Sequence, residues 1–275
     1  METEARNQAI TEHNIKDILL HKIEDADMVL VGIGEEFNEN TMLLENSREY
    51  QTFMQKTKGD SRFQQMLPFL EEIYKKETKS PRIASAYNVL EKLLLNKNYY
   101  IISTCMDDFI YDTNLKKEKI VTPCGGYRFL QCEKGCGQKL YEKNTEMLEN
   151  IMDCLEGDGG LEEIEIPSCP ECGSQLVHNN IKAQHYVEEG YLEAWNMYRK
   201  WLQGTINHKL CVIELGVGMK YPGIIRWPFE KMVFLNQKSC MFRIHSKLYQ
   251  LTEEVKERGH KIKEKPIDFL LNRFV

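Results

Sequence analysis

Four of the nine cysteines in this 275-residue chain form two short-spaced pairs, Cys132 with Cys136 and Cys169 with Cys172. Three residues separate the first pair, and two separate the second, in "CPEC". Such spacing turns both sulfurs of a pair to the same side, so two pairs supply four thiolates to one tetrahedral zinc ion. Because four protein ligands leave no open coordination position, we expect the zinc to be structural rather than catalytic.

A second group of reactive side chains ends an apolar run, in "YYIISTCMDD" at residues 99–108. Cys105, Asp107 and Asp108 come directly after residues typical of a buried strand. In sheets of parallel strands, ligands bind beyond the carboxyl ends of the strands. The thiol and the two carboxylates are therefore predicted to face a ligand site.

The elements that would position these residues alternate between strands and helices. Apolar runs near residues 28–31, 99–105, 209–218 and 240–245 predict four buried strands. Long helical stretches separate them, including one that starts with Ser80 as N-cap and Pro81 as first helical residue. This alternation predicts an α/β fold with a parallel sheet.

Glycines follow two of the predicted strands. Gly32 and Gly34 end the first strand, and Gly216 and Gly218 end the third. Glycine lets a backbone approach a pyrophosphate closely, and a helix N-terminus that follows favours its negative charge. A turn that merely closes a strand is the alternative, because Glu35 and Glu36 would repel a phosphate.

Composition narrows the function classes. The net charge of −6 and pI near 5.8 do not favour nucleic-acid binding, which needs a basic surface. The sequence contains no run of about 18 apolar residues, so we expect no membrane span. Its N-terminus lacks the pattern of a secretory signal. An odd number of cysteines without such a signal indicates thiols or metal ligands in the cytoplasm rather than a disulfide framework.

The segment between the second and third strands differs in character from its surroundings. Residues 129–178 hold the four paired cysteines together with acidic stretches, so we interpret them as a small inserted zinc-binding module. The remaining residues, 1–128 and 179–275, would form one discontinuous domain around it.

A dinucleotide-type sheet that carries a four-cysteine module resembles the sirtuin (Sir2) family over about residues 26–245. The segments "IVTPCGGYRFLQC" and "CVIELGVGMKYPGIIRWPFEKM" are most similar to the macrodomain-linked (class M) branch, whose members are protein ADP-ribosyltransferases. The resemblance implies a Rossmann-like parallel sheet with an inserted zinc ribbon. It also implies that NAD binds in the cleft between the sheet and the zinc module.

The resemblance further implies roles for individual positions. Asp107 matches the aspartate that holds the nicotinamide amide, and the four glycines match loops that contact NAD. His245 stands where sirtuins have an asparagine that contacts the adenine-side ribose. Cys105 replaces the asparagine that positions the ribose. Cys124, eight positions before Cys132, replaces the catalytic histidine, which the macrodomain-linked branch also lacks.

Three interpretations of Cys105 and Cys124 stay open at this point. One thiolate could act as base or nucleophile, the pair could form a reversible redox switch, or the catalytic residues could have been lost. ADP-ribosyl transfer to a protein is favoured over deacylation because the histidine is absent. The alternative is a catalytically degenerate protein that binds NAD or ADP-ribose, or serves as an interaction module. By family, the expected partners are a protein substrate such as a lipoylated carrier, and a macrodomain protein.

Overall fold

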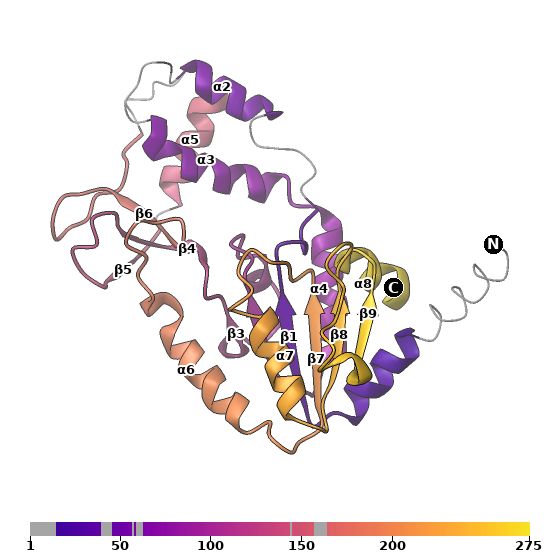
Figure 1. Cartoon of the computed structure of the whole chain (residues 1–275). Coiled ribbons are helices and arrows are strands. Elements are labelled where there is room, and N and C mark those ends of the chain that lie inside the picture. The colour runs from indigo at the N-terminus through magenta and orange to yellow at the C-terminus, as the bar shows by residue number, and fades with distance from the viewer. Residues whose placement is uncertain (1–14, 40–45, 57, 59–62, 144, 157–163) are drawn as a thin grey trace.

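A computed structural model describes residues 15–39, 46–56, 58, 63–143, 145–156 and 164–275. Its centre is a parallel sheet in which the six strands follow the order β3-β2-β1-β7-β8-β9 (Figure 1). The strands are β1 (Met28–Ile33), β2 (Asn98–Ser103), β3 (Ile120–Val121), β7 (Leu210–Leu215), β8 (Cys240–Ile244) and β9 (Gly259–Ile262). The strand order runs outward in both directions from β1 and β7, which places the topological switch point between these two strands.

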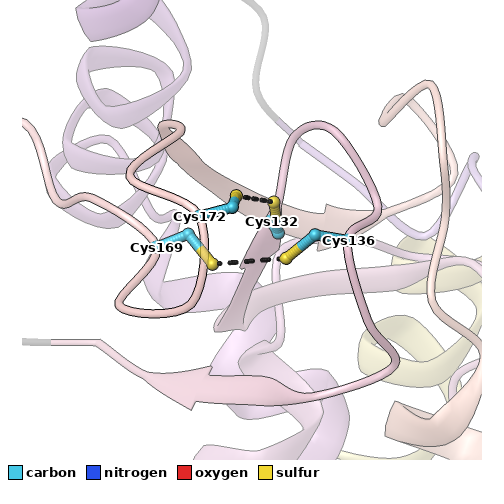
Figure 2. A group of neighbouring side chains, drawn as sticks. All are labelled: Cys132, Cys136, Cys169 and Cys172. Atoms are coloured by element: carbon cyan, nitrogen blue, oxygen red, sulfur yellow. Dashed lines mark hydrogen bonds between the residues drawn. The ribbon is translucent and has the colours of Figure 1, made fainter.

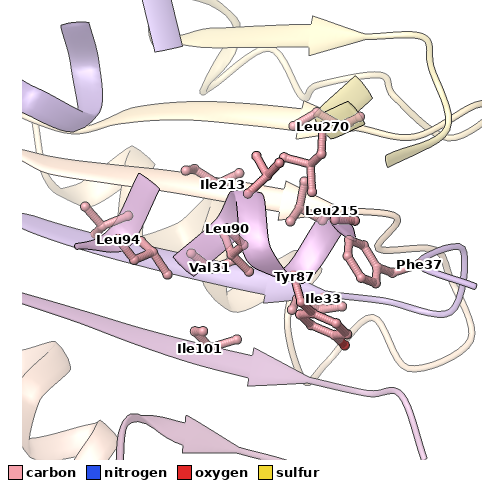
Figure 3. Packing of buried hydrophobic residues seen from close by; sticks show 14 of the residues in the cluster. Val31, Ile33, Phe37, Tyr87, Leu90, Leu94, Ile101, Ile213, Leu215 and Leu270 are labelled. Carbon is pink, nitrogen blue, oxygen red and sulfur yellow. The ribbon is translucent and has the colours of Figure 1, made fainter. Parts of the chain in front are cut away.

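Helices cover both faces of this sheet. One face packs against residues 15–25, α4 (Pro81–Leu94) and α8 (Pro266–Phe274), and the other against α6 (Glu189–Gln203) and α7 (Arg226–Leu235). Figure 3 shows the first core, where Tyr87 and Leu90 of α4 lie over Val31 and Ile213. Because both faces are covered, β1 and β7 are buried at every position, and all their residues are apolar except Glu214 of β7.

The four strands expected from the apolar runs are all present, which confirms the α/β fold with a parallel sheet. The predicted start of α4 is confirmed as well. Ser80 is its N-cap and accepts a hydrogen bond from the backbone N–H of Arg82, while Pro81 opens the helix. The short β3 and the edge strand β9 lie outside the four predicted runs.

The cysteine-containing segment forms a second, antiparallel sheet in the order β5-β4-β6. Its strands are β4 (Gly125–Cys132), β5 (Leu140–Glu142) and β6 (Leu176–Asn180). Helices α2 (Arg48–Lys56), α3 (Phe63–Glu77) and α5 (Glu146–Glu156) lie beside it (Figure 1).

One apolar cluster joins this sheet to helices that precede it in sequence. Phe69 and Leu70 of α3 pack with Leu130 of β4 and Ile151 of α5. The lobe that contains the cysteines thus also includes residues from before β2, while the domain boundaries given above stay a prediction.

Short 3-10 turns complete the chain at η2 (Phe109–Asp112), η3 (Lys117–Lys119) and η5 (Lys256–Arg258). Within the described ranges, every helix is too short or too polar to cross a lipid bilayer.

Candidate active site and metal centre

The four paired cysteines converge. Their sulfur atoms all lie within 4.8 Å of one another, with Cys132 Sγ 3.5 Å from Cys172 and Cys136 Sγ 3.6 Å from Cys169 (Figure 2). A tetrahedral zinc ion with Zn–S bonds of about 2.3 Å separates its sulfurs by about 3.8 Å, so the cluster fits this ion. The predicted structural zinc site is therefore compatible with the geometry, and all four ligand positions are filled by protein.

The carboxyl ends of β1 and β2 surround a cavity of about 170 Å³. Thr104, Cys105 and Asp107 line it from the β2 end, Glu35 lines it from the β1 end, and Lys75 of α3 contributes from the other lobe. Asp107 also lines a neighbouring cavity of about 420 Å³ between α3 and β4. The residues that follow the second strand thus face the space between the lobes, as the strand pattern predicts.

Cys105 and Cys124 are both free thiols. Cys105 lines the cavity, whereas Cys124 is fully buried and is not among its lining residues. The charge of Glu35 affects both thiols. The Cys105 thiol donates a hydrogen bond to the Gly34 carbonyl oxygen, 3.2 Å away. Burial, reinforced by the Asp107 charge, raises the pKa of Cys105 well above its usual value. Burial raises the pKa of Cys124 to about 12. Both groups are neutral thiols near pH 7, which argues against a thiolate base or nucleophile.

The two carboxylates after β2, those of Asp107 and Asp108, make different contacts. Asp107 Oδ1 accepts a hydrogen bond from the Phe109 N–H, and burial raises the pKa of this carboxyl. Asp108 adopts a left-handed backbone conformation with φ of 62° and accepts hydrogen bonds from the Tyr127 and Arg128 N–H groups. Burial raises the pKa of Asp108 to about 6. Asp108 therefore ties the end of β2 to the start of β4, leaving Asp107 directed at the cavities.

The glycine loops lie directly against each other at the switch point. A Cβ atom at Gly34 would collide with the Gly216 carbonyl, and one at Gly218 would collide with the Glu35 carboxylate. Gly216 has a φ of 68°, which favours glycine. Gly32 lies within β1, where a Cβ would meet Ile225 at 2.5 Å, so close packing of α7 explains this glycine.

Glu36 and His245 meet beside these loops. The Glu36 carboxylate accepts hydrogen bonds from the Ser246 backbone N–H at 2.8 Å and from the Ser246 hydroxyl group. His245 Nδ1 lies 3.0 Å from Glu36 Oε2 and accepts hydrogen bonds from the Lys247 and Leu248 N–H groups. Burial lowers the pKa of His245, so its imidazole is uncharged at neutral pH. The two hydrogen bonds from Ser246 therefore stabilise the negative charge of the Glu36 carboxylate.

Two buried arginines brace this region, and sequence reasoning missed them. Arg243 on β8 pairs with Glu214 on β7 at 2.6 Å and with Glu230 at 2.8 Å. Arg226 donates to the backbone oxygens of Val217 and Leu248, which fixes the loops after β7 and β8 relative to each other. A signal existed, because Glu and Arg each interrupt an otherwise apolar strand, and the two positions are register partners.

A buried network in the second lobe was also missed. Glu72 of α3, fully buried, contacts Lys143 and lies 2.9 Å from His178 of β6. Burial acts to raise the pKa of Glu72, but the hydrogen bonds from His178 and Lys143 outweigh it and lower the pKa to about 2. These contacts clamp α3 onto the antiparallel sheet.

Comparison with known proteins places this arrangement in a class. No family model matches the chain. Among solved structures, Sir2Tm bound to a propionylated peptide has a TM-score of 0.51 at 15% identity, covering 93% of this chain and 95% of that one. A Sir2 mutant solved with a peptide and NAD has a TM-score of 0.52 at 15% identity, covering 94% and 96%. The chain therefore has the sirtuin (Sir2) fold.

Sequence relatives make the placement more specific. A protein ADP-ribosyltransferase of Staphylococcus aureus (strain Mu50 / ATCC 700699) is 22% identical over 258 residues, which span 88% of this chain and 81% of the relative. A probable bifunctional ADP-ribose hydrolase/ADP-ribosyltransferase of Fusarium oxysporum f. sp. cubense is 26% identical over 153 residues. That match spans 54% of this chain but only 26% of the fungal protein. The chain thus has the Sir2 fold, and it is similar in sequence to proteins named as ADP-ribosyltransferases.

Proposed function

We propose that this protein is an NAD-dependent, protein-modifying enzyme of the sirtuin type, and that it transfers ADP-ribose rather than removing acyl groups. The observation that carries the preference is the state of Cys124. By the family resemblance, this residue would stand at the position of the sirtuin histidine. It is fully buried, and its pKa is raised to about 12. A neutral, buried thiol is a poor general base, so chemistry that needs a base at this position is disfavoured. The names of both sequence relatives support the same direction.

The nicotinamide end of NAD would occupy the cavity of about 170 Å³ at the end of β2. Asp107 would hold the carboxamide, and Thr104 and Cys105 would line the ribose. Bound NAD would supply ADP-ribose by releasing nicotinamide. The residues of the chain would bind and orient it there and keep the reacting ribose away from bulk water.

The pyrophosphate of NAD would be less well accommodated by the glycine loops in the present side-chain conformations. The Glu35 carboxylate lies against Gly218, and the Glu36 carboxylate accepts a hydrogen bond from the Ser246 N–H beside the glycine loops. A pyrophosphate placed beside the loops of Gly34 and Gly216 would meet the carboxylates of Glu35 and Glu36, so Glu36 would have to turn away first. We therefore expect NAD to bind weakly.

This misfit favours one second candidate function. A protein that keeps the fold, but has filled its phosphate site with its own carboxylates, would act as an interaction module or as a binder of a smaller ligand. The two candidates differ in one measurable respect, because only the enzyme releases nicotinamide.

The protein substrate belongs to the proposal. A protein side chain would reach the ribose through the cavity between α3 and β4, which Asp107 also lines. A lipoylated carrier protein as acceptor and a macrodomain protein as partner stay predictions from the family resemblance. A cytoplasmic location stays a prediction from the cysteine count and the N-terminal sequence.

The test uses zinc-loaded protein with millimolar NAD and two acceptors, a lipoylated carrier protein and an acetylated peptide. The expected result is nicotinamide release with an ADP-ribose adduct on the carrier or on the enzyme itself, detected by intact mass. Loss of the acetyl group with no protein adduct would overturn the preference for ADP-ribosyl transfer. If no nicotinamide is released, the protein is not the proposed enzyme, and the second candidate function, an interaction module or a binder of a smaller ligand, is favoured.

A further inference from the structure

The strand that opens the second lobe, β4, pairs irregularly over its first half. Gly125 pairs with Asn180 of β6, the next partners are Leu130 and His178, and the register shifts between these two pairs. Pairing with β5 begins only at Phe129. Bulges of this kind leave backbone groups outside the ladder and often lie next to active sites. The backbone N–H groups in the irregular part of β4 therefore need acceptors from elsewhere in the molecule.

Asp108, in the loop after β2, supplies this acceptor. Its Oδ2 atom accepts hydrogen bonds from the N–H of Tyr127 and, at 2.9 Å, from the N–H of Arg128. The backbone of Asp108 is left-handed, with φ of 62°, a conformation that aspartate adopts more readily than most residues. Gly126 allows the close approach, because a Cβ atom there would lie 2.3 Å from Asp108 Oδ1.

Tyr127 is in turn fixed to the rest of the second lobe. Its carbonyl oxygen accepts a hydrogen bond from Lys143 Nζ at 2.8 Å, and its hydroxyl group accepts one from Lys75 Nζ at 3.0 Å. Its ring lies 4.9 Å from the ring of His178. Asp108 therefore binds a residue that the second lobe already holds by its carbonyl group, its hydroxyl group and its ring.

The residue before Asp108 is the one expected to hold nicotinamide. Asp107 lines both the cavity of about 170 Å³ at the end of β2 and the cavity of about 420 Å³ between α3 and β4. Its Oδ1 atom accepts a hydrogen bond from the Phe109 N–H, 3.1 Å away. Phe109 begins the turn η2, and Asp108 is the N-cap residue of that turn. The orientation of Asp107 therefore depends on where Asp108 is held.

We propose that Asp108 is a positioning residue for the proposed reaction, because its bonds to the two N–H groups of β4 fix the turn that orients Asp107 toward the reacting end of NAD. The inference rests on the proposed function. Asp108 acts through its neighbour rather than on the reacting atoms. Such support matters, because a misplacement of about 1 Å at a reacting group can cost about a hundredfold in rate.

Two variants separate the acceptor oxygen from the negative charge. Asp108→Gly keeps the left-handed backbone but removes the acceptor. Asp108→Asn keeps one oxygen, which can accept both N–H groups because both bind the same oxygen in the wild type. Nicotinamide release by the zinc-loaded full chain is measured over a range of NAD concentrations.

We expect kcat of Asp108→Gly to fall about tenfold with less than about a twofold change in KM, because the reacting end is misplaced while the rest of NAD binds as before. Asp108→Asn should keep kcat within about threefold of the wild type, since only the charge assistance to the two hydrogen bonds is lost. An unchanged kcat in Asp108→Gly, or an equal loss of kcat in Asp108→Asn, would overturn the proposal.

A third variant keeps the aspartate and displaces it. Gly126→Ala places a Cβ atom against the Asp108 carboxylate, so it should lower kcat as Asp108→Gly does. Gly137→Ala is the matched control, because a Cβ atom at Gly137 meets no other atom within 4 Å. Equal kcat in Gly126→Ala and Gly137→Ala would contradict the role of the contact.

Amide hydrogen exchange measures the same positioning without NAD. The N–H groups of Tyr127, Arg128 and Phe109 should exchange about tenfold faster in Asp108→Gly than in the wild type, and at nearly the wild-type rate in Asp108→Asn. Unchanged exchange at Phe109 in Asp108→Gly would overturn the proposal, because Asp107 would then keep its contact without help from Asp108. If the wild type releases no nicotinamide, the proposed function fails, and these exchange rates still decide whether Asp108 holds the turn.

Discussion

The carboxylate of Glu36 accepts hydrogen bonds from both the backbone N–H and the hydroxyl group of Ser246, 210 positions further along the chain. The contact links the loop after β1 to the end of β8, across the end of the intervening β7. A negative charge from the protein itself thus occupies donors beside the glycine loops. Any anionic ligand must compete with it.

Replacing Glu36 by serine should raise NAD affinity by about tenfold, or about 1.4 kcal/mol. The gain would come from removing one carboxylate near the pyrophosphate and freeing the Ser246 donors. Calorimetric titration with NAD measures it. Glu39→Gln is the matched control, because Glu39 pairs with Arg82 and should leave affinity unchanged. Equal affinity of wild type and Glu36→Ser would show that Glu36 does not obstruct the site.

The two thiols of the candidate active site should show no ionisation in the pH profile of nicotinamide release. The pKa of Cys124 is raised to about 12 and that of Cys105 is also raised, so both stay protonated from pH 6 to pH 9. An ordinary cysteine would give an inflection near 8.5. Comparing the profiles of wild type, Cys105→Ala and Cys124→Ala tests this. An inflection near 8.5 that vanishes in either variant would restore the thiolate hypothesis.

Glu72 should stabilise the second lobe in a pH-dependent way. Its pKa is lowered from 4.5 to about 2, so its contribution is fully present above pH 4.5 and is lost as pH falls toward 2. We expect about 3 kcal/mol, obtained as the difference in unfolding free energy between wild type and Glu72→Gln in urea titrations at several pH values. Asp108 has the opposite effect, because its pKa is raised to about 6 and the free energy of unfolding therefore falls as pH rises from 3.8. Asp108 is present in both proteins, so its contribution cancels when their unfolding free energies are subtracted at each pH. A difference that does not shrink below pH 4 would contradict the assignment.

The metal cluster should bind one zinc ion per chain, and its loss should loosen the lobe built on Leu130, Phe69 and Ile151. Chelation is expected to lower the midpoint of thermal unfolding by about 5 °C or more. Metal analysis and calorimetry measure both quantities. Cys136→Ser should reproduce the loss, while Cys240→Ser, outside the cluster, should bind a full equivalent of zinc. Equal zinc content in the two variants would mean that Cys136 is not a ligand.

Much of this architecture could be predicted from the sequence because its signals are local. Continuous apolar runs identified the buried strands, the Ser80–Pro81 pair marked a helix start, and the cysteine spacing identified a cluster that the structure brings together. Each signal depends on a few neighbouring residues, so no knowledge of the tertiary structure was needed. The roles of residues 105, 107 and 124 came from the family resemblance and stay predictions; Cys105 and Asp107 line one cavity, whereas Cys124 is fully buried.

The missing parts depend on contacts between distant residues. Pairs such as Glu72 with His178 and Asp108 with the Tyr127 N–H leave no periodic trace in sequence. Glu36 was recognised as an unusual acid in a phosphate loop, but its partner Ser246 becomes visible only when the ends of β1 and β8 are placed together. The packing role of Gly32 against Ile225 is of the same kind.

The most direct test of the central claim measures nicotinamide release from NAD by zinc-loaded wild type, Glu36→Ser and Asp107→Asn. We expect release by the wild type, faster release by Glu36→Ser at low NAD, and a loss of about tenfold or more in Asp107→Asn, since Asp107 lines the cavity that would hold nicotinamide. No release by the wild type or by Glu36→Ser, with both proteins folded and containing zinc, would contradict it.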